Sequence, residues 1–177
     1  MTLRIQRSLT ATAIAAALTL GLAGCSFGGT PTASIGDTKS IEIASGADSF
    51  PVDVTVISLE QAPDEVQESF EDDSDVWFAE VEFTYTGDSS VDPARLGVLF
   101  SGVYSELKSG AFLDSTFIGL PECPGSPEGS ATEAYEALAA GETVGLCVPL
   151  SSDGDDAVTG VYVGSTDLES GGAVWRP

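Results

Sequence analysis

Alternation of apolar and polar side chains with a period of two is the feature that most constrains how this chain folds. In residues 77–86, every second residue from Trp77 through Tyr85 is apolar, whereas Glu80, Glu82 and two threonines occupy most of the intervening positions. Because successive side chains of a β-strand point to opposite faces, this pattern predicts a strand with one buried face and one solvent-facing side.

Other segments show the same alternation. Residues 143–150 place Cys147 on the face opposite their apolar side chains. Residues 52–56 also alternate, and the phase shifts at Ile57, which predicts a β-bulge. Weaker strands are expected at residues 40–44, 96–101, 111–118, 158–164 and 173–176.

Helical patterning is confined to residues 131–140, where Thr132 is the expected N-terminal cap. Turns that contain glycine, at residues 86–88 and 140–142, separate the predicted strands. Short strands with turns at this spacing are typical of an antiparallel β-sandwich. We therefore predict an all-β sandwich over residues 41–177.

The first 24 residues have the layout of a secretory signal peptide. Arg4 and Arg7 are the only charged residues before Cys25, and an uncharged run rich in Ala and Leu follows them. The apolar stretch 9–22 is shorter than the about 20 residues that a membrane-spanning helix needs. We therefore expect residues 1–24 to be removed on export.

The residues Leu22-Ala23-Gly24-Cys25 resemble the lipobox of bacterial lipoproteins. The resemblance implies cleavage before Cys25 and a diacylglyceryl thioether on its sulfur, which anchors the chain at the extracytoplasmic face of the cell membrane. The alternative is an ordinary signal peptide whose cleavage site lies near a cysteine. If Cys25 carries lipid, residues 25–40, which are rich in Gly, Ser, Thr and Pro, consist of the lipidated cysteine and a flexible tether.

Two cysteines remain once Cys25 carries lipid. In an oxidising compartment Cys123 and Cys147 are expected to pair, and closing that loop stabilises the fold by roughly 3 kcal/mol. A metal site on these two residues is not expected, because the chain has no histidine and no further cysteine lies nearby.

The excess of acidic over basic residues argues against a nucleic-acid partner. The chain contains 28 acidic and six basic residues, and two of the six basic residues lie in the predicted signal peptide. Nucleic acid would be repelled by such a surface, so no nucleic-acid binding is expected. The acidity either serves solubility alone or forms a surface for cations or a basic partner.

The densest acidic stretch lies between Pro63 and Val76, beside Phe78 on the solvent-facing phase of its predicted strand. It contains Asp64, Glu65, Glu68, Glu71, Asp72, Asp73 and Asp75, and a smaller group follows at Asp153, Asp155 and Asp156. Carboxylates are calcium ligands, and an exposed apolar residue can mark an interaction site. We predict that the loop of residues 61–75, through these seven carboxylates, and Phe78 contact a partner or a cation. The alternatives are a solvated loop without a ligand, and a second sheet or loop that covers Phe78.

No catalytic residue and no cofactor are expected. The absence of histidine removes every Ser-His and Cys-His arrangement. Ser105 and Lys108 match the Ser-x-x-Lys spacing of penicillin-interacting enzymes, but the Ser-Asp-Asn and Lys-Thr-Gly motifs of those enzymes are missing. The sequence therefore predicts a protein that is not an enzyme.

Residues 81–88 and 138–149 together resemble an immunoglobulin-like domain of uncharacterised function found in surface lipoproteins of Gram-positive bacteria, actinobacteria among them. Ala140 stands where that family has proline. The resemblance covers residues 52–163 and implies an immunoglobulin-like sandwich but no catalytic residue. With the lipobox, it implies a non-enzymatic surface interaction module with a cell-envelope protein partner. The alternative is a lipoprotein that binds calcium, a small cation or a small ligand through its acidic loops.

Overall fold

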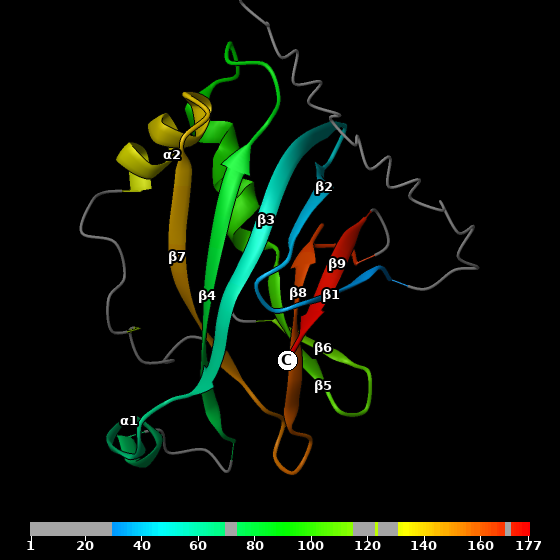
Figure 1. The fold of residues 1–177 in the computed structure, drawn as a ribbon, viewed down its shortest axis with the longest axis vertical. Coiled ribbons are helices and arrows are strands. Elements are labelled where there is room, and N and C mark those ends of the chain that lie inside the picture. The colour runs from blue at the N-terminus through cyan, green and yellow to red at the C-terminus, as the bar shows by residue number, and fades with distance from the viewer. Residues whose placement is uncertain (1–29, 70–73, 115–122, 124–130, 169–170) are drawn as a thin grey trace, which may run out of the picture.

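Two β-sheets pack face to face in the computed structural model, which describes residues 30–69, 74–114, 123, 131–168 and 171–177 (Figure 1). The four-stranded antiparallel sheet has the order β2 (Thr38–Ser45), β3 (Asp48–Gln61), β4 (Val76–Tyr85) and β7 (Thr143–Ser151). The five-stranded sheet has the order β1 (Thr32–Ser34), β9 (Gly172–Arg176), β8 (Val158–Gly164), β5 (Val103–Leu107) and β6 (Phe112–Asp114). This arrangement confirms the predicted all-β sandwich, although β1 runs parallel to β9.

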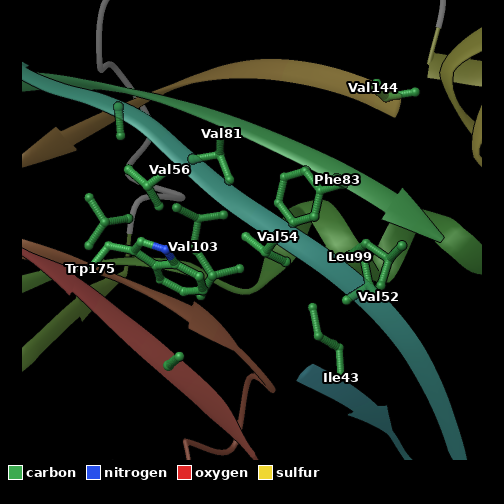
Figure 2. Close-up of a cluster of buried hydrophobic side chains, with 14 of the residues drawn as sticks. Ile43, Val52, Val54, Val56, Val81, Phe83, Leu99, Val103, Val144 and Trp175 are labelled. Atoms are coloured by element: carbon green, nitrogen blue, oxygen red, sulfur yellow. The ribbon is translucent and has the colours of Figure 1, made fainter. Parts of the chain in front are cut away.

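The core lies between the inner faces of the two sheets (Figure 2). Val54 and Phe83 from one sheet and Val163 and Trp175 from the other are fully buried, as period-two alternation requires. The indole Nε1 of Trp175 donates a hydrogen bond to the carbonyl oxygen of Asp37 at 2.8 Å, so the largest core side chain has its polar atom satisfied.

The predicted bulge is present. The pairing of β3 with β4 shifts register between Val56 and Ser58. Val56 is fully buried, whereas the side chain of Ile57 is 42% exposed. The extra residue therefore turns one apolar side chain out of the core and into solvent.

The boundary of the folded domain was predicted wrongly. Residues 32–40, expected within the flexible tether, contain β1 and the start of β2. Ala33 and Ile35 pack against the core, and the amide of Gly36 donates to the carbonyl of Val56 at 2.8 Å. Two apolar side chains in a polar segment are enough to form a strand because β9 offers a sheet edge for pairing. Residues 1–29, with the predicted signal peptide and Cys25, lie outside the described residues.

Helices are found where the sequence predicted one strand and one loop. Residues 96–101, predicted as a strand, belong to the 3₁₀-helix η1 (Pro93–Ser101), which Asp92 caps by accepting a hydrogen bond from the Ala94 amide at 3.1 Å. The acidic loop after Pro63 contains the helix α1 (Asp64–Ser69). The predicted helix is present as α2 (Ala131–Ala139), but Thr132 lies inside it and does not cap it.

Strand β5 was not predicted, because Ser105 and Glu106 interrupt its apolar pattern, yet both side chains are buried. The strand expected at residues 111–118 is described only as β6, since residues 115–118 lie outside the described part of the chain. These differences arise where burial depends on the neighbouring strand and not on local hydrophobicity.

The outer face of the five-stranded sheet is covered by its own aromatic side chains. Tyr104, Tyr162 and Val174 form a buried cluster against which Phe112 packs. The hydroxyl of Tyr162 donates to the carbonyl of Gly171 at 2.7 Å, and burial raises the pKa of Tyr162 to about 12. This face is therefore closed by residues of the chain itself.

Candidate binding surface

The acidic stretch that was expected to be a loop is partly a docked helix. Asp64, Glu65 and Glu68 lie exposed on α1, and Asp75 precedes β4. Glu71, Asp72 and Asp73 lie outside the described residues. Three of the four described acidic side chains therefore belong to a helix at one end of the four-stranded sheet, opposite the end where α2 lies (Figure 1).

Gln67 holds α1 against the ends of β3 and β4. Its side-chain amide donates to the carbonyl oxygens of Ala62 at 3.2 Å and Val76 at 2.6 Å. Its carbonyl oxygen accepts a hydrogen bond from the Val76 amide at 2.8 Å. A single side chain thus continues the hydrogen bonding of the sheet beyond the last strand pair and orients the helix.

Phe78 is not the exposed apolar residue that its strand phase predicts. It is only 9% exposed and clusters with Ala62, Val76 and Cys123. Cys123 and Cys147 form the predicted disulfide, with their Cα atoms 5.7 Å apart. The alternative prediction, that another part of the chain covers Phe78, is therefore correct. Strand phase shows which way a side chain points, but it does not show what packs over it.

The outer face of the four-stranded sheet is acidic. Its outward positions carry five carboxylates, contributed by Glu42, Asp53, Glu60, Glu80 and Glu82. Neighbouring hydroxyls neutralise none of this charge; the Ser49 hydroxyl, for example, donates to Glu42 at 3.0 Å and the Ser58 hydroxyl to Glu80 at 3.3 Å.

No basic residue in the described part of the chain lies on that face. Arg95 pairs with Asp48, and Arg176 pairs with Glu106. Lys39 is opposite the core residue Val54 and so has the inward phase of β2, and Lys108 follows β5 in the other sheet. The five carboxylates therefore face solvent without a counter-charge from the described residues.

Two adjoining hollows lie on this face. The larger, of about 360 Å³, is lined by Ile57, Glu80, Glu82, Gly145 and Cys147 together with backbone neighbours. The smaller, of about 240 Å³, is lined in part by Ser58, Glu60 and Phe78 and shares Glu80 and Cys147 with the first. We call the surface formed by Ile57, Ser58, Glu60, Glu80, Glu82, Gly145 and Cys147 the acidic groove.

Two local features explain the groove. The bulge in β3 turns Ile57 outward beside β4. Gly145 on β7 pairs with Glu82, and a Cβ atom at Gly145 would have no neighbour nearer than the Cγ of Glu82 at 4.0 Å. A missing side chain thus leaves space directly beside a carboxylate. Such a site combines apolar surface with groups that form charge-assisted hydrogen bonds to cations.

The described residues do not form the other sites that the sequence raised, namely a cation site and a Ser-x-x-Lys nucleophile. Among them, no group of three or more Asp, Glu, Cys or His side chains could hold a metal ion. In the second acidic group, Asp153 and Asp156 pair across a turn, and the Asp156 carboxylate accepts from the Ser109 amide at 2.9 Å. Ser105 is fully buried and Lys108 is exposed, so the Ser-x-x-Lys spacing does not form an accessible nucleophile.

Sequence reasoning did not identify the groove as a site. It assigned Glu80 and Glu82 to the solvent face and found the phase shift at Ile57, but it did not include Glu60 or Gly145. The pairing of β3, β4 and β7 brings these residues together, and no local pattern shows that register. A glycine inside an alternating strand is the one signal that marks a close approach or an open space.

Comparison of the chain with protein-family models, with curated proteins and with solved structures found no match in any of the three. The resemblance to an immunoglobulin-like lipoprotein domain therefore stays a prediction. Its two segments fall on the end of β4 and on the connection from α2 into β7. Within the described residues, no helix is both long enough and apolar enough to cross a bilayer.

Proposed function

We propose that this protein is a membrane-anchored extracytoplasmic lipoprotein that acts as a non-enzymatic surface interaction module for a basic protein partner of the cell envelope. The observation that carries the proposal is the outer face of the four-stranded sheet, which bears five carboxylates and no basic side chain of the described residues. Electrostatic complementarity of this kind steers association and selects partners by charge.

The connection to the membrane is short in this proposal. Six residues separate Cys25 from the first residue of β1. Fully extended at about 3.5 Å per residue, they reach roughly 20 Å. A lipid on Cys25 would thus hold the sandwich close to the headgroups, within reach of neighbouring envelope proteins.

Replacing Cys25 with serine is expected to move the protein from the membrane fraction to the soluble fraction, because the sulfur that would carry the lipid is lost. Immunoblotting of fractionated cells measures this. The matched control is the Cys123→Ser/Cys147→Ser variant, which loses two sulfurs but should remain in the membrane fraction. Retention of the Cys25→Ser variant in membranes would contradict the anchor.

In-cell crosslinking followed by capture and mass spectrometry is expected to find one dominant basic partner with the wild-type chain. The Glu80→Gln/Glu82→Gln variant should lose that partner. The Glu136→Gln/Asp155→Asn variant, which removes equal charge from two exposed sites outside the acidic groove, should keep it. Equal capture by both variants, or no enrichment with the wild type, would contradict the proposal.

A small cationic molecule is the second candidate ligand. The larger hollow, of about 360 Å³, falls within the range of small-molecule sites, roughly 300–1,000 Å³. The crosslinking experiment separates the two, because a small-molecule receptor would show no dominant protein partner.

A further inference from the structure

We propose that Cys147 is a site of reversible S-thiolation, at which neutral or cationic thiols open the disulfide to Cys123 and with which anionic thiols react slowly. The inference concerns the chemistry of the disulfide and needs no bound partner, so it goes beyond the proposed function. It follows from the unequal exposure of the two cysteines and from the charges around the more accessible one.

The two halves of the disulfide differ in access. Cys147 is half-buried, and it lines both hollows of the acidic groove. Cys123 is only 6% exposed and lies in the apolar cluster around Phe78. Because exchange requires an attacking thiolate to reach a sulfur atom, the hollows direct the attack to Cys147.

The exchange needs no reagent other than the thiol. A thiolate attacks the Cys147 Sγ atom, forms a mixed disulfide with it and displaces the Cys123 Sγ atom as a thiolate, which takes a proton from water. A second thiolate attacks the reagent sulfur of the mixed disulfide and releases Cys147 as a thiolate. Two reagent thiols are thus oxidised to one disulfide, and the protein disulfide is reduced to two thiols. The apolar cluster around Cys123 disfavours the departing thiolate, which makes the first step slow.

Carboxylates surround the more accessible cysteine. Glu80 pairs with Cys147 across β4 and β7, so their Cβ atoms lie about 5 Å apart. Glu82 is the next outward residue along β4, and Glu60 lines the smaller hollow together with Cys147. In about 0.1 M salt charges interact over about 10 Å, so these carboxylates act on an approaching thiolate while more distant charges are screened.

The charge of the reagent therefore affects the rate of attack. Every attacking sulfur is a thiolate, so a second anionic group on the reagent increases the repulsion, and an ammonium group offsets it. No basic residue in the described part of the chain lies on this face to compensate the carboxylates. Opening the bond would remove the covalent link that holds Cys123 over Phe78. The carboxylates thus protect that link from anionic thiols.

Reduction kinetics with three two-carbon thiols test the inference on the full-length chain, purified in a nonionic detergent. Cysteamine, 2-mercaptoethanol and 2-mercaptoethanesulfonate carry an ammonium, a hydroxyl and a sulfonate group on the same skeleton. Each rate is expressed per thiolate and divided by the rate of the same thiol with a small neutral disulfide, which removes differences in intrinsic reactivity. In about 0.1 M salt the normalised rate for cysteamine is expected to be about tenfold higher than that for mercaptoethanesulfonate.

Two variants separate the local carboxylates from the overall negative charge. Glu80→Gln/Glu82→Gln should reduce the ratio of the two rates to about twofold, whereas Glu136→Gln/Asp155→Asn, which removes equal charge elsewhere, should leave it unchanged. Raising the salt to about 1 M, where charges interact over about 3 Å, should also reduce the ratio. A ratio near one for the wild type in the lower salt, or equal ratios in the two variants, would overturn the inference.

The sulfur that is attacked is identified separately. Quenching the reaction early with a maleimide traps the released thiol, and digestion after glutamate separates the two cysteines for mass spectrometry. The reagent is expected on Cys147 and the maleimide on Cys123. The reverse labelling would overturn the assignment of Cys147. Because no partner takes part, these results are independent of the crosslinking that tests the proposed function.

Discussion

Replacing Gly102 with alanine is expected to lower the free energy of unfolding by about 3 kcal/mol, at the upper end of the range for overpacking. Gly102 connects η1 to β5, and its carbonyl accepts a hydrogen bond from the Gly164 amide at 2.9 Å. A Cβ atom at this position would overlap the carbonyl oxygen of Gly164. Because the obstacle is backbone, no side-chain rotation relieves the contact, and the start of β5 must move away from β8.

Urea denaturation of the wild type and the variant measures this difference. Gly145→Ala is the matched control, because its new Cβ atom would have no neighbour nearer than 4.0 Å. The control is expected to lie within about 0.5 kcal/mol of the wild type, as is usual for surface changes. Similar stabilities of the two alanine variants would show that the close approach of Gly102 and Gly164 does not constrain the fold.

Replacing Arg176 with alanine is expected to lower the free energy of unfolding by about 3 kcal/mol, because it leaves a buried carboxylate without its partner. Glu106 is only 5% exposed. The Arg176 Nε and Nη2 atoms donate to its two carboxylate oxygens at 2.7 and 2.5 Å. The pair joins β5 to the end of β9, with room supplied by Gly160, where a Cβ atom would lie 2.6 Å from the Glu106 carboxylate.

Two controls identify the cause of that loss. Adding Glu106→Gln to the Arg176→Ala variant removes the buried charge and should recover part of the stability. Arg95→Ala breaks an arginine–carboxylate pair whose two side chains are 47% and 54% exposed, and it should destabilise the protein much less than Arg176→Ala does, because solvent screens an exposed pair. A double variant no more stable than Arg176→Ala would mean that the unpaired charge is not what destabilises the protein.

The sequence by itself determined the features whose cause is local. Alternation in residues 77–86 and 143–150 predicted β4 and β7, because burial of one sheet face imposes a period of two on each strand. The phase shift at Ile57 predicted the bulge, and the count of cysteines predicted the disulfide. Helix α2 was also predicted within one residue of its observed end.

The tertiary structure alone decided which segments meet. Strand β1 forms because β9 offers an edge, and Glu106 lies buried in β5 because Arg176 reaches it from β9. Phe78 is covered because the disulfide brings Cys123 to β7. The acidic groove needs the register of three strands separated along the chain, and register depends on the packing of the whole sheet rather than on any one segment.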